Sequence, residues 1–269
     1  MLNIESTINL NSNHKMPLLG LGVWQIPNGR KTEQAVEWAL QAGYKHFDTA
    51  KFYKNESSVG RVINQSNIPR DNIWVTTKIW PTDLYNTQKA FEDSLKRLEL
   101  DYIDLYLVHW PIPGFEKRSW KSMEKIYESG RVKSIGVSNY SVAQLKKILS
   151  IASVPPAVNQ IKCSPFNYKP KMYEFCIKNN IALEAYSPLT RGSRLADEKL
   201  SNIAKKYKKS TAQILIRWAL QKNIIVIPKS DNKVHIDENA NVYNFELNAK
   251  DMHKLDKFTE NKPDSFLGF

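Results

Sequence analysis

The chain has 269 residues, of which 42% are hydrophobic, enough for one large domain with a buried core. It has neither an apolar stretch long enough to cross a bilayer nor the pattern of a signal peptide at its start, so we expect a cytoplasmic protein with no membrane contact. The formal net charge is +12, but the lysines are scattered and no aromatic–basic RNA-binding signature is present. We therefore expect a solvated basic surface and no nucleic-acid partner.

The chain begins with a weakly alternating segment, residues 4–10, a polar turn and a second short segment, residues 16–18. This pattern predicts a β-hairpin ahead of the main fold. Residues 19–24 then form a first short strand, whose two glycines would allow close approach by another part of the chain.

Helical and strand patterns alternate from residue 32 onward. Residues 103–109 are almost continuously apolar, as expected for a strand buried on both faces. Two helices begin at capping boxes, Ser141 with Gln144 and Ser210 with Gln213. The predicted helices cover residues 32–42, 57–64, 90–98, 120–127, 141–150, 171–178, 197–207 and 210–221, and the strands after the first cover residues 44–49, 72–79, 103–109, 132–137, 158–162, 181–186 and 224–227.

This alternation predicts an α/β fold in which eight parallel strands close into a (β/α)8 TIM barrel. No linker rich in Gly, Ser or Pro interrupts it, so we expect a single domain over residues 1–269. A doubly wound open sheet is the alternative, but it would need a glycine-rich turn that leads into a helix, and residues 23–27 after the first two glycines are no helix start. Cys163 and Cys176 lack metal-ligand spacing, so we expect reduced thiols and no metal.

Barrels of this kind have their active sites at the carboxyl ends of the strands. Asp48, Lys78 and His109 stand at three such ends, and Tyr53 follows in a loop. Taken singly, they have ordinary alternative interpretations: a turn cap, a surface lysine, a core histidine and a loop aromatic. A purely structural barrel would have few charges here, because an unpaired buried charge is costly.

Over nearly its whole length the chain resembles the aldo-keto reductase superfamily. No single motif is specific to this superfamily, but the order of the motifs along the chain is. The short loops are most similar to those of bacterial and protist members such as the 2,5-diketo-gluconate and glyoxal reductases. The resemblance rests on residues 43–50, Tyr53 with 55–56, 77–78, 104–111, 136–139, 159–160, 185–189 and 227–230.

The resemblance implies NADPH-dependent reduction of aldehydes or ketones to alcohols, with Tyr53 as the proton donor and Asp48, Lys78 and His109 completing a tetrad. A tyrosine pKa of about 10 is high for proton donation near neutrality. We expect Lys78, kept charged by Asp48, to lower the pKa of Tyr53, and His109 to bind the substrate oxygen.

Cofactor contacts also follow from the resemblance. Ser138, Asn139 and Gln160 would bind the nicotinamide carboxamide, and Tyr186 would stack on the nicotinamide ring; a helix cap is the alternative role for Ser138. Ser187 and Leu189 would line the pyrophosphate path. Lys229 and Ser230 would hold the 2′-phosphate, and Glu238 and Asn239 would lie near the adenine.

The chain departs from the family pattern at His235, where many NADPH-dependent relatives have an arginine. Histidine is only partly charged near neutrality, and Asp231 adds a negative charge nearby. Lys229 and Lys233 remain, so we expect a preference for NADPH by a smaller margin, with some use of NADH.

Trp24, Trp80 and Trp110 follow or end strands and would form, with His109, an aromatic wall of the substrate site. A core position is the alternative for Trp80. The short segments 111–119 and 263–269 suggest an open site for small aldehydes, dicarbonyls or keto-sugars in a monomeric enzyme. The rival interpretations are a non-catalytic cofactor-binding sensor and a basic nucleic-acid-binding protein.

Overall fold

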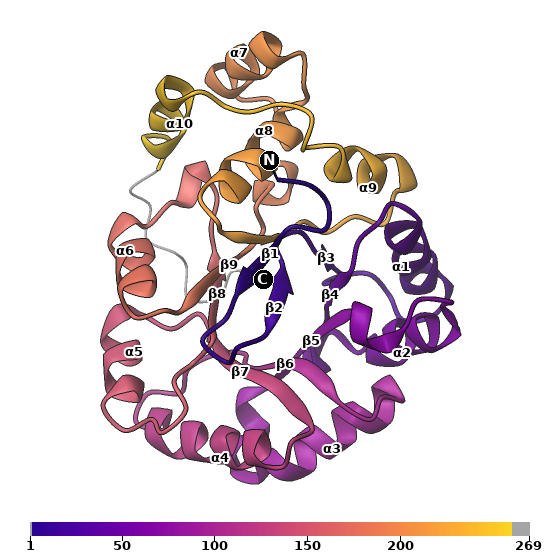
Figure 1. Cartoon of the computed structure of the whole chain (residues 1–269), viewed down its shortest axis with the longest axis vertical. Helices are drawn as coiled ribbons and strands as arrows, with labels where there is room; N and C mark the ends of the chain where they lie inside the picture. The colour runs from indigo at the N-terminus through magenta and orange to yellow at the C-terminus, as the bar shows by residue number, and fades with distance from the viewer. Residues whose placement is uncertain (1, 260–269) are drawn as a thin grey trace.

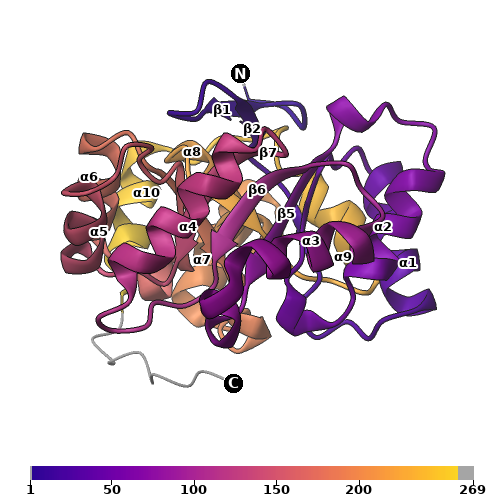
Figure 2. The same ribbon diagram turned by 90° about the horizontal axis from the view of Figure 1, so that it is seen from below.

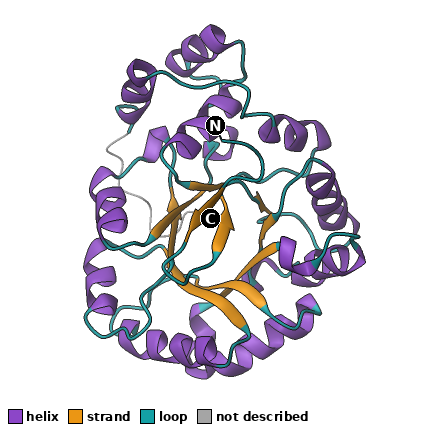
Figure 3. Cartoon of the chain, viewed as in Figure 1, coloured by secondary structure: helices purple, strands orange, loops and turns teal. Residues whose placement is uncertain are grey.

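A ring of helices surrounds a central barrel of parallel strands in the computed structural model, which describes residues 2–259 (Figure 1; Figure 3 shows the strands in orange). The strands are β1 (Thr7–Asn9), β2 (Lys15–Pro17), β3 (Leu21–Gly22), β4 (His46–Asp48), β5 (Trp74–Ile79), β6 (Ile103–Val108), β7 (Val132–Ser138), β8 (Val158–Lys162), β9 (Ala182–Tyr186) and β10 (Ile225–Ile227). The α-helices are α1 (Arg30–Gln41), α2 (Glu56–Gln65), α3 (Thr87–Leu98), α4 (Glu116–Glu128), α5 (Val142–Leu149), α6 (Pro170–Lys178), α7 (Glu198–Tyr207), α8 (Thr211–Gln221), α9 (Lys233–Ala240) and α10 (Ala249–Asp256). The short 3-10 helices are η1 (Lys51–Tyr53), η2 (Arg70–Asn72), η3 (Pro81–Asn86), η4 (Pro165–Asn167) and η5 (Thr190–Gly192).

The sheet runs in the order of the chain from β3 to β10, with all eight strands parallel. Two isolated bridges, Leu19 with Val226 and Gly22 with Lys229, join its first and last strands. A Cβ atom on Gly22 would lie 3.1 Å from the carbonyl oxygen of Ile227, so glycine allows this close approach. The predicted barrel is confirmed, and the open sheet is wrong.

The hairpin of β1 and β2 covers the amino end of the barrel (Figure 2). The side chain of Asn11 donates to the carbonyl of Pro156, just before β8, at 3.0 Å. The hydroxyls of Ser12 and Ser134, near the start of β7, are 2.7 Å apart. The carboxyl ends of the strands are therefore left for the site.

The predicted elements are found with boundaries shifted by a few residues, and both capping boxes are present. The sequence patterns predict neither α9 nor α10. Helix α9 buries only Ile236 and Asn239, so its sequence has no apolar stripe to reveal it.

Cys163 and Cys176 are buried and free, as predicted. Among residues 2–259, no helix is both long and apolar enough to span a membrane. The predicted short segment 263–269 lies outside the described residues.

Candidate active site

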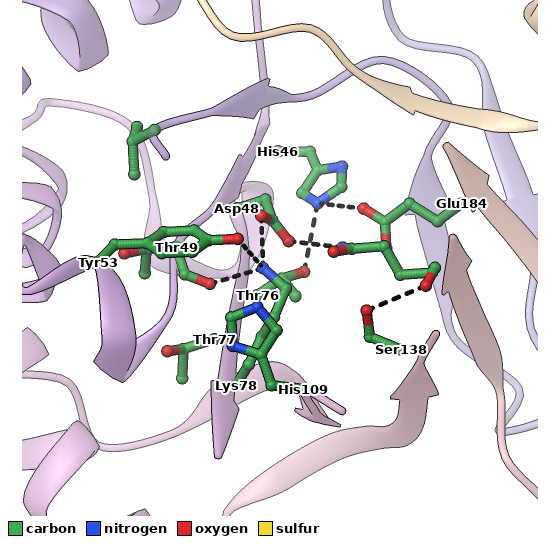
Figure 4. Close-up of polar contacts among 12 residues, drawn as sticks. His46, Asp48, Thr49, Tyr53, Thr76, Thr77, Lys78, His109, Ser138 and Glu184 are labelled. Atoms are coloured by element: carbon green, nitrogen blue, oxygen red, sulfur yellow. Dashed lines mark hydrogen bonds and ion pairs between the residues drawn. The ribbon is translucent and has the colours of Figure 1, made fainter. Parts of the chain in front are cut away.

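Three neighbouring strand ends and one short helix bring the four predicted catalytic side chains together (Figure 4). Asp48 ends β4, Lys78 lies near the end of β5, and His109 directly follows β6. Tyr53 is the last residue of η1, which follows β4. Because parallel strands end at the same rim of the barrel, side chains distant in sequence meet there.

Lys78 is fully buried and lies at the centre of the cluster. Its Nζ donates to Asp48 Oδ1 at 2.6 Å, to the carbonyl of Thr49 at 2.9 Å and to the hydroxyl of Tyr53 at 3.4 Å. These three acceptors match the three donors of an ammonium group, so its burial is compensated. The alternative of a surface lysine is wrong.

Asp48 links the ammonium to the wall of the barrel. While Oδ1 accepts from Lys78, Oδ2 accepts from Nε2 of Gln160 on β8 at 2.8 Å. Burial raises the pKa of Asp48, and the Lys78 charge and the Gln160 hydrogen bond oppose this rise. Two short hydrogen bonds to its oxygens favour the carboxylate form.

The structure corrects the expected direction of the Tyr53 pKa. Burial, followed by the negative charge of Asp48 and that of Glu184 when it is ionised, raises the pKa of Tyr53 well above its usual value. The ammonium of Lys78 does not reverse this, because it lies 3.4 Å from the phenol oxygen and bonds more closely to Asp48 and Thr49. The phenol therefore keeps its proton at neutral pH.

His109 is buried and uncharged near neutrality. Burial, and then the charge of Lys78, lowers its pKa well below the usual value. Its ring packs edge-on against Tyr53 and Trp80, at centroid distances of 5.6 and 5.1 Å. Its Nδ1 has no hydrogen-bond partner within residues 2–259. A neutral imidazole offers one donor nitrogen to a carbonyl oxygen.

Asn55 holds the loop that carries Tyr53, a positioning role that the sequence interpretation missed. Its buried side chain accepts from the hydroxyl of Thr49 at 2.8 Å and donates to the carbonyls of Val23 and Ile26, both at 2.9 Å. It thereby joins the loop after β4 to the loop after β3. The motif of residues 55–56 was the available signal.

A cavity of about 700 Å³ opens over the tetrad and extends toward the start of α9. Three members of the tetrad line this cavity, and Lys78 lies beneath the lining. Of the predicted cofactor residues, Ser230, Glu238 and Asn239 are outside the lining. The predicted residues that line the cavity are Trp24, Asp48, Tyr53, Trp80, His109, Trp110, Ser138, Asn139, Gln160, Tyr186, Ser187, Leu189, Lys229 and His235.

One wall of this cavity is rich in amide and hydroxyl groups. Tyr186 donates its hydroxyl proton to Oδ1 of Asn139 at 2.8 Å, and Asn139 donates to the Oγ of Ser138 at 3.0 Å and the carbonyl of His109 at 3.1 Å. Gln160 adds a further amide. Amide and hydroxyl groups beside an aromatic ring suit a planar carboxamide-bearing ring, so these residues fit a nicotinamide.

The far end of the cavity has two basic side chains. Lys229 lies two residues after β10 and pairs with Asp231 at 2.9 Å, and His235 lies in the first turn of α9. The buried hydroxyl of Ser230 accepts from the backbone N–H of Asn232, so in this structure it supports the turn. These groups fit a phosphate, with Asp231 competing for Lys229.

Two loops meet over the cavity. The guanidinium of Arg191 lies 4.5 Å from the ring centroid of Trp24. Gln25, Ser187 and Arg191 adopt left-handed backbone angles, with φ of 62°, 49° and 53°. The loop after β3 thereby contacts the loop after β9.

Aromatic rings line the side of the cavity next to His109. Phe52 stacks on Trp80 with centroids 4.0 Å apart and an interplanar angle of 13°. Trp80 is therefore in the cavity wall, and its alternative as a core residue is wrong. Among residues 2–259, no group of three or more metal-ligating side chains is present.

Comparison with known proteins gives consistent matches. The model of the aldo/keto reductase family matches residues 18–260. The chain is 44% identical to a 9,11-endoperoxide prostaglandin H2 reductase of Trypanosoma cruzi, over 97% of this chain and 95% of that one. It is 40% identical to a glyoxal reductase of Bacillus subtilis, over 98% of both chains.

Solved structures of other proteins are also similar to this chain. An aldo-keto reductase from a deep-sea metagenome library is 42% identical and has a TM-score of 0.91 over 96% of both chains. The aldose reductase of Schistosoma japonicum is 34% identical, with a TM-score of 0.91 over 97% of this chain and 95% of that one.

Proposed function

The chain belongs to the aldo/keto reductase family and is an NAD(P)H-dependent oxidoreductase, and we propose that it reduces small carbonyl compounds to alcohols with NADPH, using Tyr53 as the proton donor. The substrates would be small aldehydes, dicarbonyls or keto-sugars. The single observation that carries the proposal is the chain of contacts from Tyr53 through Lys78 to Asp48, at 3.4 and 2.6 Å, in the floor and wall of one cavity.

Each member of the tetrad has a role in this proposal. A nicotinamide cofactor, when bound, supplies a hydride to the carbonyl carbon. Tyr53 gives its proton to the carbonyl oxygen, and Lys78 stabilises the phenolate that forms. Asp48 keeps Lys78 charged and in place. Neutral His109 donates a hydrogen bond that orients the carbonyl group.

The high pKa of Tyr53 in the unliganded site is compatible with this role. It keeps the hydroxyl of Tyr53 protonated at neutral pH. Tyr53 needs to become a stronger acid only as negative charge develops on the substrate oxygen. The phenolate formed in that step faces the ammonium of Lys78, which is already desolvated and held by Asp48.

The two ends of the cavity support the cofactor assignment. Ser138, Asn139, Gln160 and Tyr186 would hold the nicotinamide, and Ser187 and Leu189 the pyrophosphate path. Lys229 would pair with the 2′-phosphate, with Ser230, Glu238 and Asn239 nearby and His235 as a weaker second cation. Some use of NADH follows from the absence of an arginine there.

The aromatic wall and the relatives support the substrate class. Phe52, Trp80 and Trp110 narrow the cavity beside His109. The relatives include a glyoxal reductase and methylglyoxal reductases. A monomeric chain in the cytoplasm completes the proposal.

The test is the rate of NADPH and NADH oxidation by the purified protein with methylglyoxal, glyoxal and a panel of small aldehydes and keto-sugars. We expect turnover with both cofactors and a higher kcat/KM for NADPH. Tight cofactor binding without turnover of any carbonyl would favour a sensor instead. A gel shift with steep salt dependence would favour nucleic-acid binding.

A further inference from the structure

A second buried carboxylate lies beneath the tetrad and has no role in the mechanism above. Glu184 is on β9, two residues before Tyr186, and is fully buried inside the barrel. Its Oε1 lies 3.6 Å from Nε2 of His46, which is on β4 two residues before Asp48. Figure 4 shows these two side chains pointing toward each other, with Asp48 beside them.

The polar atoms of this pair are poorly satisfied. Within residues 2–259, the two carboxylate oxygens of Glu184 have no hydrogen-bond partner. The same is true of Nδ1 of His46. The amide of Gln160 is nearby: its Nε2 donates to Asp48 at 2.8 Å, and its interaction with Glu184 only partly offsets the rise of the Glu184 pKa caused by burial. An ionised carboxylate without hydrogen bonds is costly in a buried site. The geometry therefore favours a pair that retains a proton.

The imidazole of His46 is held in place by its surroundings. A Cβ atom on residue 20 would lie 2.4 Å from its Nδ1, so Gly20 provides the space for the ring. On the other side, Nε2 lies 3.2 Å from the hydroxyl of Thr76 on β5. The closeness of His46 to Glu184 is thus imposed by the packing of the barrel.

The charged groups that face Glu184 come from two strands. β4 contributes His46 and Asp48, and β5 contributes Lys78. On the strands adjacent to β9, the residues in register with Glu184 are uncharged, Gln160 on β8 and Ile225 on β10. The charge of an ionised Glu184 also acts on the phenol of Tyr53, which lies outside these strands.

Electrostatics agrees with a retained proton. Burial, and then the charge of Asp48, raises the pKa of Glu184 to about 8. Burial, and then the charge of Lys78, lowers the pKa of His46 to about 3. At neutral pH the proton of the pair therefore resides on Glu184. An ionised Glu184 raises the pKa of Tyr53 and so opposes formation of the phenolate.

We propose that Glu184 is a positioning residue of the reduction: with His46 it retains one proton beneath Asp48, so that no second anion forms beside Lys78 and Tyr53. The inference rests on the proposed function. Loss of this proton at alkaline pH places a carboxylate next to Asp48, makes the phenolate of Tyr53 more costly and slows turnover.

The first test compares the pH dependence of kcat/KM in wild type, Glu184→Gln and a matched control, Glu124→Gln. Glutamine has nearly the shape of a protonated glutamate and stays neutral at every pH. Glu124 is also buried, but it lies on α4 outside the barrel. We expect the alkaline decrease to move up by about one pH unit in Glu184→Gln and to stay in place in Glu124→Gln. An alkaline limb in Glu184→Gln identical to that of the wild type would overturn the proposal.

The second test is independent of turnover. In infrared spectra, the C=O stretch of a protonated carboxyl group should be present at pH 6 and lost by pH 9 in the wild type and in Glu124→Gln. It should be absent from Glu184→Gln at both values. A wild-type spectrum without this band would overturn the proposal even if the enzyme reduces carbonyls. An intact band in a protein that reduces no carbonyl would overturn the proposed function, and this role with it.

Discussion

The Nζ of Lys78 lies 2.6 Å from Oδ1 of Asp48, and both side chains are buried inside the barrel. This ion pair accounts for two properties of the site. It compensates the burial of the ammonium group beneath the cavity, and it holds that group 3.4 Å from the hydroxyl of Tyr53.

Replacing Lys78 should affect activity and stability separately. Lys78→Met leaves Asp48 buried and unpaired, so we expect loss of turnover and a decrease of about 3–5 kcal/mol in the free energy of unfolding. The double variant Lys78→Met/Asp48→Asn removes both charges and should recover much of that stability without recovering turnover. Urea denaturation and steady-state assays measure the two effects. Wild-type turnover in the double variant would show that the charge is dispensable.

The cofactor preference should depend on Lys229. For Lys229→Ala we expect the Kd for NADPH to increase about tenfold, the effect of losing one charge-assisted hydrogen bond, while the Kd for NADH stays constant. Lys233, which the sequence groups with Lys229, pairs instead with Asp237 and lies outside the cavity lining, so Lys233→Ala is the matched control. Fluorescence titration of both cofactors measures these constants. An unchanged Kd for NADPH in Lys229→Ala would place the 2′-phosphate elsewhere.

His235→Arg should have the opposite effect. An arginine at the start of α9 would offer a permanent charge and a planar fork to the phosphate. We expect tighter NADPH binding and a larger ratio of the two kcat/KM values. The same titrations serve as the measurement, and an unchanged ratio would show that residue 235 does not face the phosphate.

The proton on Glu184 should also be visible in stability. Between pH 6.5 and 8 the folded chain retains this proton and the unfolded chain does not, because the pKa is raised to about 8 on folding. The free energy of unfolding should therefore fall as pH rises, by up to about 1.4 kcal/mol per pH unit from this group. Below pH 6.5, protonation of His46 and His109 in the unfolded chain offsets the trend. Denaturation of wild type and Glu184→Gln across this window measures the slope, and equal slopes would contradict the assignment.

The stacked pair of Phe52 and Trp80 should limit substrate size. Phe52→Ala removes one ring from the cavity wall and leaves the tetrad in place. We expect kcat/KM for bulky aromatic aldehydes to rise about tenfold relative to methylglyoxal, in line with the lower end of the effect of one buried methylene group. A constant ratio would show that the wall at Phe52 does not contact the substrate.

Most helices could be predicted from their periodic apolar patterns, two of them also from capping boxes, and the eight strands from the short apolar runs between them. The site could be located because strand ends of a parallel barrel share one rim, which brought Asp48, Lys78 and His109 together from three separate motifs. The motif after β4 also contains Tyr53 and Asn55, but the sequence does not show which groups the side chain of Asn55 contacts.

Three features depended on three-dimensional contacts that no sequence pattern displays. The sequence predicts a lowered pKa for Tyr53, but burial, then the charge of Asp48 and that of Glu184 when it is ionised, raises it, because Lys78 bonds more closely to Asp48 and Thr49. Glu184 lies within the predicted strand of residues 181–186, and its proximity to His46 arises from barrel closure. Helix α9 has no apolar stripe, so only its contacts reveal it.

If Tyr53 donates the proton, Tyr53→Phe should abolish turnover without disturbing the rest of the site. Phenylalanine keeps the ring that packs against His109 and removes only the hydroxyl. Turnover of methylglyoxal and the Kd for NADPH should be measured on the same preparation. We expect a loss of kcat of at least about a hundredfold with a nearly unchanged Kd. Turnover close to that of the wild type would contradict proton donation by Tyr53.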